Sequence, residues 1–174
     1  MLSGLPLWCQ TQANKGSAPS GDIYGGATFT GSNPASNASA GFGGGVDFRA
    51  YKWIEAQVDV SGFFATSGVA NLTSTVDYLV GPRIANPHSV SKLKPFADFL
   101  IGGQTFHNGS TQHTYYYGNG SGLAYAVDGG VDIGLTRHLA IRGQAGFISS
   151  AYVTAPTTTT NYRWRAGSFL VYRF

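Results

Sequence analysis

Residues 165–174 read RAGSFLVYRF, and their side chains alternate in character up to the last position. In an extended chain, Leu170, Tyr172 and Phe174 lie on one face, while Arg173 lies on the other. Such period-two alternation predicts a β-strand whose two faces meet different surroundings. The stretch therefore raises the question of which surroundings lie on each face.

The same alternation recurs along most of the chain. Apolar and aromatic residues occupy every second position in eight segments, each of about ten residues or more, the length that a tilted strand needs to cross a bilayer. The eight expected strands cover residues 21–30, 38–50, 54–64, 74–84, 95–106, 122–135, 139–152 and 161–174. No segment shows a competing helical period, so an all-β fold is expected.

Composition narrows the class of protein. Charged residues make up 11% of the 174-residue chain, against roughly 25% in typical soluble domains, and aromatic residues make up 14%. No apolar run approaches the ~18 residues of a transmembrane helix. This composition favours a membrane β-barrel, with a soluble β-sandwich or small barrel as the alternative. We expect one barrel domain over 21–174, and we interpret 1–20 as a signal-peptide remnant or a disordered segment.

The charged residues follow the strand pattern. All eight acidic residues and six of the seven arginines fall on the strand face opposite the apolar stripe. A closed barrel with apolar residues towards lipid would enclose these charges and let acids and guanidiniums pair across the lumen. We call this set the interior charge network: Asp22, Asp47, Arg49, Glu55, Asp59, Asp77, Arg83, Asp98, Asp128, Asp132, Arg142, Arg163, Arg165 and Arg173.

Glycines on the same face would leave room for these bulky side chains. They are Gly41, Gly43, Gly45, Gly130 and Gly134. Together, the two faces predict an eight-stranded, antiparallel, up-and-down transmembrane β-barrel with a filled polar interior.

The connections between the expected strands alternate in charge. Those that follow 38–50, 74–84 and 122–135 contain Lys52, Lys92, Lys94 and Arg137. The other four, which include the threonine-rich segment VTAPTTTTN at 153–161, contain no charged residue. Barrels of this class have short periplasmic turns and longer external loops, so we place the charged set and both termini on the periplasmic side.

The residues also resemble a known family. Ser168, Leu170, Tyr172 and Phe174 are similar to the C-terminal β-signal of bacterial outer-membrane proteins, a terminal Phe preceded by apolar residues at alternate positions. The whole of 21–174 resembles the small OmpA-like and OmpX-like eight-stranded barrels. The stretches that carry the resemblance are DIYGGATFT (22–30), YLVGPRI (78–84), PFADFLIGG (95–103) and AVDGGVDIGLTRHLAIRGQAGF (126–147).

The resemblance implies a location and a route of assembly. We expect a bacterial outer-membrane protein in contact with outer-membrane lipid and lipopolysaccharide. Periplasmic chaperones would escort the chain, and the barrel insertion machinery would recognise Leu170, Tyr172 and Phe174 as the assembly signal. We expect a monomer without a cofactor, a metal or a nucleic-acid partner.

For function, we expect a structural or surface-interaction role rather than catalysis. Tyr115, Tyr116 and Tyr117 lie in a Gly-, Asn- and Ser-rich connection and are candidates for recognition. One alternative is a lipid-modifying enzyme of the lipid A deacylase type, although the His-x-Ser motif of that family is absent. The second alternative is a soluble lipocalin-like barrel that binds a small apolar ligand.

The histidines provide little support for catalysis or metal binding. His88 and His138 fall on expected turns, whereas His107 and His113 fall near a loop without nearby acids. A metal site needs several convergent ligands, so we interpret all four as polar loop or interface residues.

Overall fold

The computed structural model describes residues 21–32, 38–65, 73–86, 92–108, 120–154 and 157–174. Within these ranges the chain forms eight β-strands. They are β1 (Gly21–Ser32), β2 (Ala38–Tyr51), β3 (Ile54–Ala65), β4 (Thr73–Ala85), β5 (Leu93–Asn108), β6 (Gly120–Gly134), β7 (Leu139–Thr154) and β8 (Thr157–Arg173).

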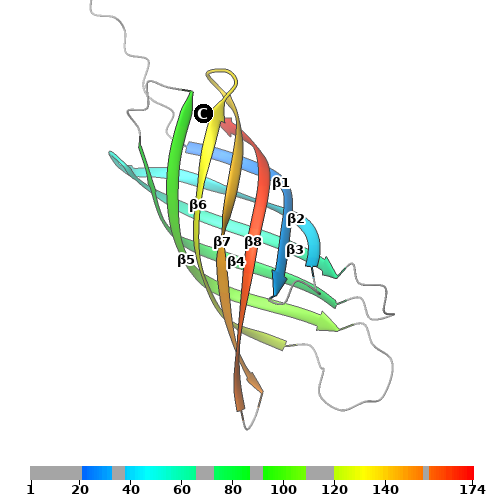
Figure 1. Ribbon diagram of the computed structural model, residues 1–174. Helices are drawn as coiled ribbons and strands as arrows, with labels where there is room; N and C mark the ends of the chain where they lie inside the picture. The colour runs from blue at the N-terminus through cyan, green and yellow to red at the C-terminus, as the bar shows by residue number, and fades with distance from the viewer. Residues whose placement is uncertain (1–20, 33–37, 66–72, 87–91, 109–119, 155–156) are drawn as a thin grey trace, which may run out of the picture.

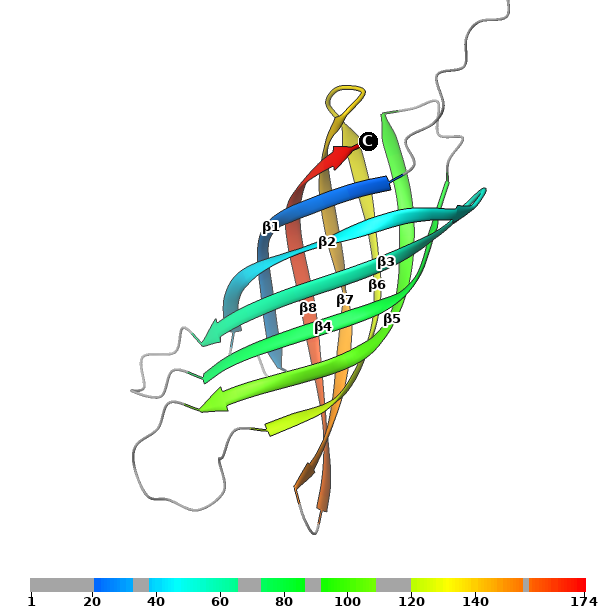
Figure 2. The same cartoon turned by 180° about the vertical axis from the view of Figure 1, so that it is seen from behind.

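The strands close into one barrel. Each strand pairs antiparallel with its neighbour in the sequence, and β8 returns to pair with β1 from Asp22↔Arg173 to Ser32↔Arg163. Figure 1 and Figure 2 show the tilted strands from opposite sides, with the C-terminus and the β6–β7 turn at the same end. None of the described residues forms a helix long and apolar enough to cross a membrane. The expected all-β, eight-stranded antiparallel barrel is confirmed.

Two expectations about the connections are wrong. The segment 153–161, expected as a long loop, belongs mostly to β7 and β8, which stay paired as far as Thr154↔Thr157. Threonine is β-branched and favours a pleated strand, which explains the longer hairpin. Lys94 was expected in a turn, but β5 begins at Leu93, so Lys94 lies inside a strand.

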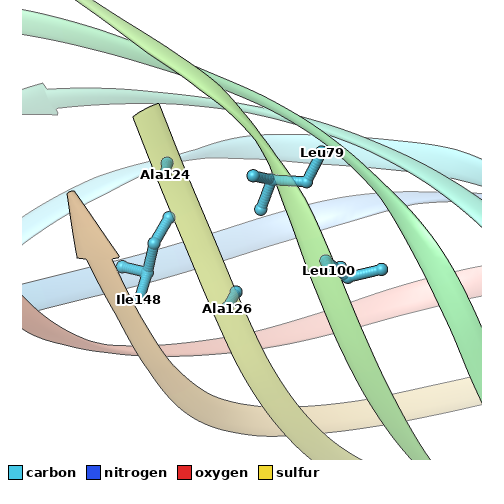
Figure 3. Close-up of a cluster of buried hydrophobic side chains, with 5 residues drawn as sticks. All are labelled: Leu79, Leu100, Ala124, Ala126 and Ile148. Atoms are coloured by element: carbon cyan, nitrogen blue, oxygen red, sulfur yellow. The ribbon is translucent and has the colours of Figure 1, made fainter. Parts of the chain in front are cut away.

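Apolar side chains fill part of the lumen. Leu79, Leu100, Ala124, Ala126 and Ile148 form a buried cluster contributed by β4, β5, β6 and β7 (Figure 3). Leu100 lies opposite Ala126, and Ala126 lies opposite Ile148, in the strand register. These side chains occupy the inner face next to the charged residues, so the barrel interior is packed rather than hollow.

Glycines allow close approach of neighbouring strands and side chains. A Cβ atom on Gly45 would lie 2.0 Å from the Val58 carbonyl oxygen and 2.5 Å from the Tyr24 hydroxyl oxygen. A Cβ atom on Gly130 would lie 2.4 Å from the Phe96 ring. The small residue is therefore required at both positions, because the large Tyr24 and Phe96 side chains occupy the adjacent lumen.

The outer face is apolar over the whole wall. Large apolar and aromatic side chains from every strand are exposed, up to 74% for Phe42 and 70% for Phe147. Further examples, one for each remaining strand, are Phe29, Val60, Val80, Phe99, Val127 and Leu170. A surface of this kind is unfavourable in water and matches the hydrocarbon layer of a bilayer.

Candidate functional site

The lumen contains a set of buried ion pairs. One cluster of them forms around Arg83 and Arg142, towards the end of the barrel that carries the β2–β3 and β6–β7 turns, called the turn end below. Arg83 pairs with Asp98 at 2.8 Å and also with Asp47. Arg142 lies 2.7 Å from Asp132 and 2.9 Å from Asp47. Both guanidiniums are almost completely buried, and Asp47, which contacts both, links them into one cluster.

Asp22 and two aromatic rings complete the surroundings of this cluster. The nearest Arg142–Asp22 contact is 3.7 Å long. The Arg142 guanidinium lies 4.5 Å from the centre of the Tyr24 ring, and Arg83 lies 3.8 Å from that of Phe96. The flat guanidiniums thus interact through their edges with carboxylates and through their faces with aromatic rings, an arrangement suited to arginine.

A second cluster forms around Arg165 of β8. Arg165 pairs with Asp128 and reaches Asp59, on β3, at 3.1 Å. The Tyr24 hydroxyl donates a hydrogen bond of 2.9 Å to Asp59 and lies 2.8 Å from the Gln57 amide. Because the Tyr24 ring also contacts Arg142, this one side chain connects the two clusters.

Further charges occupy the two ends of the lumen. Arg163 lies 3.8 Å from Asp77, which accepts a hydrogen bond from Gln104. At the turn end, Arg173 contacts Asp132 at 3.4 Å.

Two other residues extend this end of the network. Lys94 pairs with Glu55 at 2.7 Å. Arg49 is half-buried at the end of β2, where its Nε has no hydrogen-bond partner within the described part of the chain.

All acidic residues assigned to the interior charge network are thus buried inside the barrel, and five of its arginines have carboxylate partners. Sequence reasoning missed Lys94, Tyr24, Gln57 and Gln104. Tyr24, Gln57 and Gln104 lie at inward positions of their strands and could have been assigned from alternation alone. Lys94 could not, because it was placed outside the expected strand.

A small cavity lies beside the Arg165 cluster. Its lining includes Thr28, Asp59, Ser61, Gln144 and Arg165, and it has room for about one water molecule. The neighbouring lumen is filled by the charge network and the apolar cluster. This arrangement fits a structural polar core better than a route for solutes.

The side chains at the end of β8 alternate between the outer face and the lumen, as the sequence predicts. Leu170, Tyr172 and Phe174 are about half exposed on the outer face, whereas Phe169 and Val171 are buried in the lumen. Leu170, Tyr172 and Phe174 therefore form a continuous outward stripe at the seam between β8 and β1.

The loop and histidine candidates are only partly described. Tyr115, Tyr116, Tyr117, His88 and His113 lie outside the described residues, as does the segment 1–20.

Two histidines belong to described segments. His107 lies in β5, while His138 lies in the β6–β7 turn with Nδ1 3.0 Å from the Arg173 carbonyl oxygen. Within the described ranges, no group of three or more His, Cys, Asp or Glu residues could hold a metal ion.

The orientation of the charged residues contradicts the lipocalin-like alternative. A soluble ligand-binding barrel has an apolar cavity and a polar exterior. Here Asp128, Asp132 and Arg165 are buried inside, and large apolar side chains cover the outside. The polarity of the barrel is that of a membrane protein.

Comparison with known proteins supports the same fold. No protein-family model and no curated protein matches the sequence. Among solved structures, Neisserial surface protein A (NspA) matches with a TM-score of 0.67 at 12% identity, covering 89% of this chain and 97% of that one.

Two Pseudomonas aeruginosa proteins also match. The outer membrane protein OprG has a TM-score of 0.62 at 11% identity, covering 90% of this chain and 96% of that one. The N-terminal β-barrel domain of OprF has a TM-score of 0.58 at 11% identity, covering 90% and 98%. In fold, the chain is a closed eight-stranded antiparallel β-barrel, similar to the barrels of these outer-membrane proteins.

Proposed function

We propose that this protein spans a bacterial outer membrane as a non-catalytic, side-chain-filled barrel that displays uncharged loops at the cell surface. The observation that carries the proposal is the inverted polarity of the wall. Phe42 and Phe147 are more than two-thirds exposed on the outer face, whereas Arg83 and Arg142 are almost fully buried in the lumen. Only a lipid environment makes such an exterior favourable.

The surface role rests on the composition of the connections at the end away from the termini. The connections after β1, β3 and β5 contain no Lys, Arg, Asp or Glu, and the last of them contains Tyr115, Tyr116 and Tyr117. Tyrosine among Gly, Ser and Asn gives adaptable contacts by stacking and hydrogen bonding. We propose that these loops meet lipopolysaccharide and surface partners through such contacts, with the barrel as a monomeric support.

Assembly is proposed to depend on the outward stripe of β8. Leu170, Tyr172 and Phe174 are accessible on the outer face of the last strand, where barrel insertion machinery could read them after delivery by periplasmic chaperones. In the finished barrel the same side chains face lipid.

Heat modifiability and loop tagging test the proposal together. A closed barrel in the membrane fraction should migrate differently on a gel before and after boiling. An epitope inserted within 33–37 should be labelled on intact cells, whereas one inserted beside Thr136 should be labelled only after permeabilisation. Identical migration in both lanes, or labelling of the Thr136 site on intact cells, would contradict the proposal.

A further inference from the structure

The side-chain charges divide sharply between the inside and the outside of the barrel. All eight Asp and Glu residues of the chain are buried, with at most 6% of each residue exposed. Six of the seven arginines and Lys94 belong to the same lumen. The remaining cations in the described ranges are Lys52, Lys92 and Arg137, and all three are exposed. The outer surface therefore carries positive side-chain charge without acidic side chains to neutralise it.

These three residues share one end of the barrel. Lys52 lies in the turn between β2 and β3, Lys92 precedes β5, and Arg137 lies in the turn between β6 and β7 (Figure 1). We call them the basic rim. The connections at the opposite end contain no charged residue, so the charged connections all lie at one end of the barrel.

Backbone hydrogen bonds hold the basic rim in place. The Trp53 carbonyl accepts from the amide of Ala85 at 2.9 Å, and the Lys92 carbonyl accepts from that of Gly134 at 2.7 Å. The His138 carbonyl accepts from the amide of Arg173 at 2.8 Å. Lys92 itself is therefore hydrogen-bonded to the end of another strand. Lys52 and Arg137 each precede a residue that is bonded in this way, so the backbone positions of all three cations are fixed.

Aromatic side chains beside the basic rim indicate that this end of the barrel lies at a membrane surface. Tyr51 and Trp53 flank Lys52 and are about half exposed, and the Lys52 ammonium lies 5.5 Å from the centre of the Tyr51 ring. Near Arg137, Tyr172 is half exposed and stacks with His138 at 6.2 Å between ring centres. Tyr and Trp concentrate at the headgroup level of membranes, and Lys and Arg extend to the same level from the apolar wall.

We infer that the basic rim binds the phosphate headgroups of anionic phospholipids in the leaflet at the turn end of the barrel. This inference rests on the proposed membrane location. The Lys and Arg side chains would reach phosphates in the adjacent leaflet, and no exposed carboxylate side chain would repel them. A cation near an anionic surface favours an adjacent anionic headgroup by roughly severalfold, so anionic lipid should be enriched around this end of the barrel.

The test compares lipid association in vesicles of defined composition. The full chain is inserted into vesicles of phosphatidylcholine containing phosphatidylglycerol, and the fraction of spin-labelled lipid immobilised by the protein is measured for each headgroup. At low salt we expect labelled phosphatidylglycerol to exceed labelled phosphatidylcholine by roughly severalfold. In 1 M NaCl the ratio should approach one, because the screening length falls to about 3 Å.

Matched variants separate charge from other effects. Combining Lys52→Gln, Lys92→Gln and Arg137→Gln should abolish the preference, whereas combining Lys52→Arg, Lys92→Arg and Arg137→Lys should keep it. Equal association of both lipids with the native chain, or a preference that survives the glutamine substitutions, would overturn the inference. Heat modifiability is measured on every sample. An inserted barrel without lipid preference refutes only the basic rim, whereas a native chain that does not insert into vesicles refutes the proposed membrane role as well.

Discussion

Phe174 and Gly21 close the barrel through both backbone and side chain. Their backbones exchange two hydrogen bonds, of 3.0 and 3.2 Å. A Cβ atom on Gly21 would lie 2.9 Å from the Phe174 ring, so the ring covers the space that the missing side chain leaves. The terminal aromatic is therefore a packing element of the β1–β8 seam as well as part of the outward stripe.

Removing the ring should weaken closure. We expect Phe174→Ala to lower severalfold the fraction of chain that becomes heat-modifiable in vesicles, because the seam loses its cover over Gly21. Phe147→Ala is the control, since Phe147 is 70% exposed on the outer wall and lies away from this seam. Equal folded fractions for the two variants would show that Phe174 has no special role in closure.

Arg83 should be among the most sensitive positions in the lumen. We expect Arg83→Met to lower the free energy of unfolding by about 3–5 kcal/mol, because Asp98 is left buried without its guanidinium and Asp47 keeps only Arg142. Urea unfolding in vesicles, followed by tryptophan fluorescence, measures the change. Arg163→Met should cost clearly less, since Arg163 is partly exposed and lies 3.8 Å from Asp77. A smaller loss for Arg83→Met than for Arg163→Met would contradict the prediction.

Gly45 tests how tightly the lumen is filled. We expect Gly45→Ala to destabilise the barrel by about 1–3 kcal/mol, because the added methyl group meets the Val58 carbonyl and the Tyr24 hydroxyl. Gly143→Ala places a methyl group where no atom lies within 4 Å and should leave unfolding almost unchanged. The same urea measurement compares them, and similar midpoints for both variants would argue against a tightly packed lumen around Tyr24.

Lys94 and Lys52 should respond differently to the same substitution. Lys94→Gln removes the 2.7 Å contact with buried Glu55 and should destabilise the barrel by about 1–3 kcal/mol. Lys52→Gln changes an exposed turn residue and should leave stability within about 0.5 kcal/mol. If both variants unfold at the same urea concentration, the interior role of Lys94 is wrong.

The strands and their faces could be predicted because alternation along a strand has a period of two. Once Leu170 is assigned outward, the positions of Phe169 and Val171 follow without knowledge of the partner strands. The pairing across the lumen could not be predicted in this way. Arg142 on β7 meets Asp47 on β2 only because of the tilt and stagger of the closed wall, which are properties of all eight strands together.

The errors of the sequence prediction also have physical causes. Lys94 follows the polar sequence of a turn, and only its pairing with Asp132 in the β5–β6 register places it in the wall. The threonines at 157–160 resemble a polar loop in composition, but they continue the β7–β8 hairpin. In both cases, hydrogen bonding to a neighbouring strand decides the structure, and composition alone does not report it.

Inverted polarity is the central claim, and a spin-label scan of β3 tests it most directly. Single cysteines would replace residues 56–61 in a Cys9→Ser background, each labelled in the vesicle-inserted barrel. Labels at Ala56, Val58 and Val60 should show high accessibility to oxygen, which dissolves in lipid, and labels at Gln57, Asp59 and Ser61 should show low accessibility. Loss of the alternation, or its inversion, would contradict a barrel with lipid outside and charges inside.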